Sequence, residues 1–131
     1  MFRLLLCLLI LINPVVHART PAPSDAELYF ISPVDGETVS SPVTVRFGLR
    51  NMGVAPAGVE SENTGHHHLI IDAELPASDQ PVPNDANHRH FGKGQTETRL
   101  ELAPGSHTLQ LLLGDHTHTP HTPVVKSEGS P

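Results

Sequence analysis

Residues 43–50 alternate between apolar and other side chains, and this pattern constrains the fold more than any other feature of the chain. Successive side chains of a β-strand point to opposite faces, so every second residue here would face a core. No window of the sequence shows a sustained helical period. The sequence therefore predicts an all-β fold, and its short strands separated by turns favour a small antiparallel, immunoglobulin-like β-sandwich.

The other strands are predicted from apolar or alternating runs at 27–31, 65–72, 88–91, 96–102 and 107–113. Pro104-Gly105 suits the central positions of a type II turn, so the strands on either side of it are expected to pair with each other. Residues 51–64 and 75–87 are expected to be irregular connections. The expected core contains Phe30, Val45, Phe47, Leu69, Ile71, Leu100, Leu109 and Leu111.

Residues 1–18 have the features of a secretory signal peptide. Arg3 supplies the positive charge, an apolar run follows, and Val16-His17-Ala18 matches a small-residue cleavage pattern, so cleavage is expected after Ala18. The apolar run is too short to span a bilayer as a helix. Cys7 lacks the small preceding residue that a lipoprotein anchor requires. We therefore expect a periplasmic or secreted protein, with no membrane association after cleavage.

The rest of the chain is expected to form one domain with short ends. Residues 19–26 are interpreted as a flexible leader, 27–125 as the β-domain and 126–131 as a disordered tail. The formal net charge of −6 argues against nucleic acid as a partner. The single cysteine lies in the predicted signal peptide, so neither a disulfide nor a thiolate ligand is expected after cleavage.

Histidine carries the strongest functional signal, because a His-x-His pair occurs three times among ten histidines. In an extended strand, His66 and His68 would share one face, whereas His67 would turn toward the core. The other pairs are His88 with His90 and His116 with His118. Two imidazoles on the same side of a strand form half of a typical metal site.

We therefore predict a surface site for one divalent ion. Imidazole nitrogen without thiolate favours Cu(II) or Zn(II), and the affinity order favours Cu(II). Four ligands require two of the three pairs, and Pro120 makes the last pair the first to leave out. Asp72 and Asp115 are expected to accept imidazole N–H bonds, and affinity is expected to fall below about pH 6.5. The candidate ligands are His66, His68, His88, His90, His116 and His118.

Three further residues are interpreted more conservatively. His107 follows the Pro104-Gly105 turn and is expected to be a hydrogen-bonded structural histidine rather than a ligand. Met52 is expected to pack within its loop, although a thioether can also bind Cu(I). His121 follows Pro120, and the sequence leaves open which way its side chain points.

The order of the motifs resembles DUF4399, a bacterial family of exported domains of unknown function. The resemblance covers roughly residues 28–125 and implies an exported β-domain, without an established activity. The matching segments are Ser32–Gly36, Met52–Gly58, Thr64–Asp72, His90–Glu97 and Leu109–His116.

Two functions remain open, and a third is weaker. The first is a periplasmic protein that binds copper or zinc for buffering or delivery, with a possible periplasmic protein partner. The second is a non-catalytic envelope interaction module whose histidines are structural or pH-responsive. The third, a metal-dependent enzyme, lacks support because neither Gly-x-Ser-x-Gly nor His-Glu-x-x-His occurs in the sequence.

Overall fold

The computed structural model describes residues 10–14 and 18–129. Most of the predicted signal peptide therefore lies outside the described residues, as do the last two residues of the predicted tail. The described part contains no helix long and apolar enough to cross a membrane.

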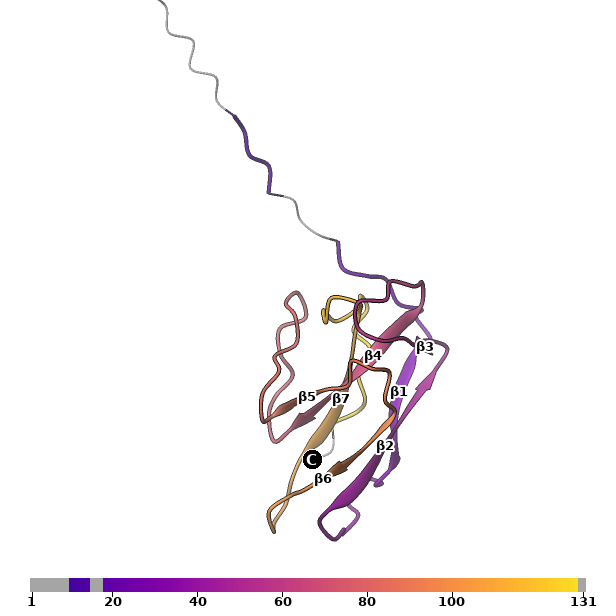
Figure 1. Ribbon diagram of the computed structural model, residues 1–131, viewed down its shortest axis with the longest axis vertical. Helices are drawn as coiled ribbons and strands as arrows, with labels where there is room; N and C mark the ends of the chain where they lie inside the picture. Colours follow the sequence, from indigo (N-terminus) through magenta and orange to yellow (C-terminus); the bar gives the residue numbers. More distant parts are fainter. Residues whose placement is uncertain (1–9, 15–17, 130–131) are drawn as a thin grey trace, which may run out of the picture.

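Within the described residues the chain is all-β, with two sheets and no helix (Figure 1). A three-stranded sheet has the order β1 (Glu27–Ser32), β2 (Val43–Arg50), β6 (Glu97–Leu100). The second sheet contains β3 (Gly53–Val54), β4 (Thr64–Ile71) and β5 (His88–His90), in that order, and β7 (Leu109–Gly114), which pairs with β4. Every pairing between these strands is antiparallel except that of β3 with β4.

The two sheets share one apolar core. The alternation predicted for β2 is confirmed, since Val45 and Phe47 are 0 % and 3 % exposed. From the other sheet, Leu69 of β4 and Leu111 of β7 are fully buried in the same cluster. Phe30 and Leu109, also expected in the core, are partly buried and pack against it.

The second sheet is also covered on its other face, and this determines where the histidines lie. Ile70 of β4 and Leu112 of β7 form a smaller buried cluster with Val82. Val82 belongs to the connection between β4 and β5, which lies beside the yellow segment after β7 in Figure 1. A backbone hydrogen bond of 2.9 Å from Val82 N to His118 O joins the two segments. Both faces of β4 are therefore shielded from solvent.

Two expectations about strand pairing were wrong. The strands on either side of Pro104-Gly105 are not partners, because β6 pairs with β2 and β7 pairs with β4. A period of two indicates which face of a strand is buried, but it does not identify the neighbouring strand. The connection over 51–64 also contains β3, which is parallel to β4, so the sheet is mixed rather than purely antiparallel.

The expected flexible leader and disordered tail are both hydrogen-bonded to the domain. Ala22 N donates to Thr122 O over 3.1 Å, and Thr122 N donates to Thr20 O over 2.9 Å. At the other end, Ser127 is 3 % exposed and its backbone N–H donates to Leu111 O over 3.0 Å. Two prolines suggested a flexible leader and polar composition a disordered tail, but backbone groups of both segments pair with the domain.

Candidate metal centre

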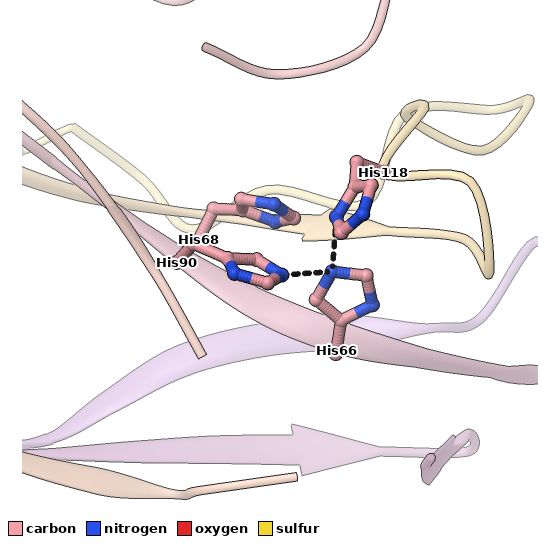
Figure 2. A group of neighbouring side chains, drawn as sticks. All are labelled: His66, His68, His90 and His118. Carbon is pink, nitrogen blue, oxygen red and sulfur yellow. Dashed lines mark hydrogen bonds between the residues drawn. The ribbon is translucent and has the colours of Figure 1, made fainter. Parts of the chain in front are cut away.

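Four histidines from three segments meet against the covered face of the second sheet (Figure 2). One ring nitrogen from each lies within 4.8 Å of the corresponding nitrogen of every other member. We call this group the four-histidine centre; its members are His66, His68, His90 and His118.

Strand geometry supplies three of the four rings. His66 and His68 lie two residues apart on β4 and so point to the same side. In the antiparallel register His90 of β5 lies directly opposite His68, which brings its ring to the same side of the sheet. The centroids of the His68 and His90 rings are 5.2 Å apart.

The fourth ring comes from a tight turn after β7. Asp115 Oδ1 accepts hydrogen bonds from Thr117 N at 2.8 Å and from Thr119 N at 3.0 Å. His118 N donates to Asp115 O over 2.9 Å, and His118 has the left-handed φ of 68°. This turn aims His118 at the rings on the sheet, whereas an extended chain would have carried it alongside His116.

Arg19 and Thr20 form hydrogen bonds with the same turn. Thr20 Oγ1 donates to Asp115 Oδ2 over 2.7 Å. The Arg19 guanidinium donates to the carbonyl oxygens of Pro120 and His121. The segment expected to be a flexible leader therefore supports the loop that carries His118.

Two of the nitrogen–nitrogen distances in the centre are close to those around a chelated ion. His66 Nε2 lies 3.1 Å from His118 Nδ1 and 3.1 Å from His90 Nε2 (Figure 2, dashed lines). Four nitrogens placed tetrahedrally about 2.0–2.1 Å from a zinc ion would be about 3.3 Å apart. These two separations are a few tenths of an ångström below that spacing, and the other pairs lie within 4.8 Å, so ring rotations would be needed to bring all four nitrogens to one ion.

Burial gives a second reason why these residues fit an ion. His66 and His68 are each 1 % exposed and His90 and His118 are half-buried, so the site predicted at the surface is instead partly buried. Within the described part of the chain, neither ring nitrogen of His68 has a hydrogen-bond partner, and His66 Nδ1 has none. A buried polar group left unpaired costs about 1–3 kcal/mol, and a coordinate bond to an ion would satisfy one nitrogen of His68.

Burial also keeps the rings in the form that binds metal. Desolvation, together with repulsion from His118 and His90, lowers the pKa of His66 to about 4. Desolvation, together with repulsion from the neighbouring rings of the centre, lowers the pKa of His68 to about 3. The pKa of His90 is lowered by the same causes. Neutral imidazole is the ligand form, so these three rings are ready to bind at neutral pH.

Two glycines leave the space that these rings occupy. A Cβ at Gly114 would lie 2.6 Å from His68 Cε1, and a Cβ at Gly92 would overlap the His90 ring. Sequence reasoning did not identify these positions or Thr20 as parts of the site. The glycines lie in motifs that support the resemblance to DUF4399, whereas no sequence pattern singles out Thr20.

Two predicted ligands lie outside the four-histidine centre. The strand register places His88 opposite Ile70, two residues further along β4 than the His68 position that faces His90. The Nδ1 atom of His88 lies 2.7 Å from Asp85 Oδ1. His116 is not a member of the group, and its Nε2 lies 3.8 Å from Glu60 Oε2. The last His-x-His pair is therefore split: His118 joins the centre despite the nearby Pro120, and His116 does not.

The carboxylates expected to accept imidazole N–H bonds from the site have other partners. Asp72 Oδ2 lies 2.7 Å from His107 Nδ1, and this contact lowers the pKa of Asp72 and raises that of His107. Burial opposes ionisation of Asp115, but hydrogen bonds from Thr20 and from the turn outweigh it and lower the Asp115 pKa. Asp115 thus supports the site through the backbone of the turn rather than through a ring nitrogen.

Among the described residues, His67, His121 and Met52 have structural surroundings. His67 turns into the core, where its ring centroid is 5.1 Å from that of Phe47. His121 is fully buried, with Nε2 3.0 Å from Thr64 O. Met52 packs against the core, as a packed loop methionine would.

Comparison with known proteins gives a family but no activity. Residues 45–129 match the domain of unknown function DUF4399. This match covers more than half of the chain, so the chain belongs to the DUF4399 family and the predicted resemblance is confirmed. Neither the curated proteins nor the solved structures contain a significant match.

Proposed function

We propose that this member of the DUF4399 family binds one transition-metal ion in its four-histidine centre. The observation that carries the proposal is the convergence of four imidazole nitrogens within 4.8 Å of one another. Two of the four rings are almost fully buried, and their unpartnered nitrogens fit coordination better than isolated hydrogen bonding.

The donor set favours Cu(II) or Zn(II). Each ligand in the group is a neutral imidazole nitrogen, which suits these ions, whereas calcium and magnesium prefer oxygen. At equal availability the affinity order places Cu(II) above Zn(II). We propose that the ion is cargo to be buffered or delivered and that the protein is not an enzyme.

We further propose that the protein works in the periplasm or outside the cell. The support is the sequence of residues 1–18, with its positive charge, apolar run and Val16-His17-Ala18. The immunoglobulin-like topology likewise stays a prediction, supported by two sheets that share a core.

A non-catalytic envelope module is the second candidate. Burial lowers the pKa of His67 to about 4, although this ring faces the core and takes no part in the four-histidine centre. Buried histidines that destabilise the fold when they protonate could make an interaction surface respond to acid without any metal.

Titration calorimetry of tag-free protein with Cu(II) and Zn(II) at neutral pH tests the metal proposal. We expect one ion per chain, and we expect His68→Ala and His118→Ala each to weaken binding by more than about tenfold, the lower end of what loss of even an outer-shell partner costs. His88→Ala and His116→Ala are matched controls and should bind like the parent protein.

Binding no tighter than roughly millimolar, which corresponds to about 4 kcal/mol, would overturn the metal proposal. Equal losses in the control variants would also contradict it, because they would indicate unspecific binding to surface histidines. In either case the envelope module would become the leading candidate.

A further inference from the structure

A cavity of about 210 Å³ adjoins the four-histidine centre. Three of the four rings line it, and the fourth, His66, is not part of its wall. The lining residues are His68, Pro81, Val82, Asn84, His90 and His118. The cavity thus meets the centre at the rings of His68, His90 and His118.

The charge of a bound ion would be uncompensated by its ligands. Four neutral imidazoles leave a divalent ion with its full charge of two, because the group contains no carboxylate. Asp115 is the nearby acid that acts electrostatically on His66, but its oxygens accept hydrogen bonds from Thr20, Thr117 and Thr119. A partly buried charge without a counter-charge is costly.

The wall of the cavity increases this cost. Pro81 and Val82 are apolar, and Val82 is 7 % exposed. Among the described lining residues Asn84 is the one polar side chain besides the histidines, and it is neutral. A cation beside such a wall has few protein dipoles to replace its water on that side, so an anion there would be stabilised strongly.

We propose that this cavity binds a small monodentate anion, which coordinates the ion as an additional ligand. The anion would approach through the face formed by His68, His90 and His118. One water molecule occupies about 30 Å³ in the liquid, so a volume of about 210 Å³ accommodates a halide, azide or formate. This inference rests on the metal binding proposed above and adds a ligand class to the same centre.

Azide is a suitable probe, because its coordination to Cu(II) produces a charge-transfer absorption band. Calorimetry first establishes that Cu(II) is bound, and azide is then titrated into the copper-loaded full chain. We expect a saturable band while copper stays on the protein. Val82→Phe, which fills the cavity, should weaken azide binding by more than about tenfold and leave one copper per chain.

Charge at the rim provides a second test that does not depend on repacking. Asn84 is exposed and lines the cavity, so Asn84→Lys should tighten azide binding by about threefold and Asn84→Asp should weaken it by about the same factor. Gln80 is exposed in the same connection but does not line the cavity. Gln80→Lys and Gln80→Glu are therefore matched controls, with an expected change below about twofold.

The two proposals can fail separately. If copper does not bind in the first step, the metal proposal fails. If copper binds but azide gives no saturable band, strips the copper, or binds equally well to every Asn84 and Val82 variant, the anion site is wrong and the metal proposal stands.

Discussion

Thr20 Oγ1 donates a hydrogen bond to Asp115 Oδ2 over 2.7 Å, although the two residues are 95 positions apart in the chain. The other carboxylate oxygen of Asp115 accepts hydrogen bonds from the backbone N–H groups of Thr117 and Thr119, the residues on either side of His118. Thr20 therefore acts on the four-histidine centre through Asp115. The N-terminal segment therefore supplies no ligand itself, but it helps to position the ligand His118.

Replacing the Thr20 hydroxyl should weaken metal binding. In Thr20→Val one oxygen of the buried Asp115 carboxylate loses its partner, which should lower the free energy of unfolding by about 1 kcal/mol. The His118 turn should become more mobile, so we expect a several-fold loss of Cu(II) affinity and faster hydrogen exchange at the Thr119 amide. Thr20→Ser retains the hydroxyl and should restore both values; if it does not, the hydrogen bond is not the cause.

Gly114→Ala should displace the ligand His68 through a steric clash with its ring. The added Cβ would lie 2.6 Å from His68 Cε1, so the ring must move away from the other three. We expect more than a tenfold loss of metal affinity, together with a destabilisation of about 1–3 kcal/mol from overpacking. Gly53→Ala is the matched control, because its Cβ would lie at an ordinary 3.5 Å from Thr64 Cγ2. Equal metal affinity in the two variants would contradict the steric argument.

Metal binding should persist to lower pH than free histidine allows. The sequence alone predicts loss of affinity below about pH 6.5, but the pKa values of His66 and His68 are lowered to about 4 and about 3. Protons therefore compete weakly with the ion for these two rings between pH 6.5 and pH 4. Calorimetric titrations at pH 7.0 and 5.5 should show a modest change, well short of the fall of about 100-fold expected if two ordinary imidazoles had to lose a proton.

The metal-free protein should lose stability as the pH falls from about 6.5 toward 4. His66, His67 and His68 have lowered pKa values in the folded chain, whereas the unfolded chain binds their protons at the ordinary value. The unfolded state therefore takes up more protons in this range and is favoured by acid. His107, whose pKa is raised, acts in the opposite direction. Urea titrations at pH 7 and pH 5 measure the balance, and equal stability at both values would contradict burial of the three neutral rings.

Most of the strands could be predicted because burial on one face leaves a period of two. Buried Val43, Val45 and Phe47 are separated by half-buried Thr44 and exposed Arg46, and residues 43–50 form β2 with the predicted bounds. β3 could not be predicted in this way, because two residues cannot show a period. The pairing partners of β6 and β7 could not be predicted either, because a turn such as Pro104-Gly105 can connect strands of two different sheets as readily as two neighbouring strands.

The candidate site was only partly predictable from the three His-x-His pairs. Strand parity correctly separates His66 and His68 from His67, which packs on Phe47 in the core. Parity cannot separate His88 from His90, because both point to the same side of β5. Their difference comes from register, which sets His90 opposite His68 and moves His88 one step away.

The sequence by itself determined that this chain is built of β-strands and that its histidines occur in pairs able to share a face. Both properties are local, because they follow from the alternation of side chains along an extended backbone. Only the tertiary structure decided which histidines meet and that two of the four are buried where they meet. Those outcomes depend on the register between β4 and β5, on the left-handed turn at His118, and on the 72–87 connection that covers the sheet. Each depends on contacts between residues distant in sequence, which no local pattern records.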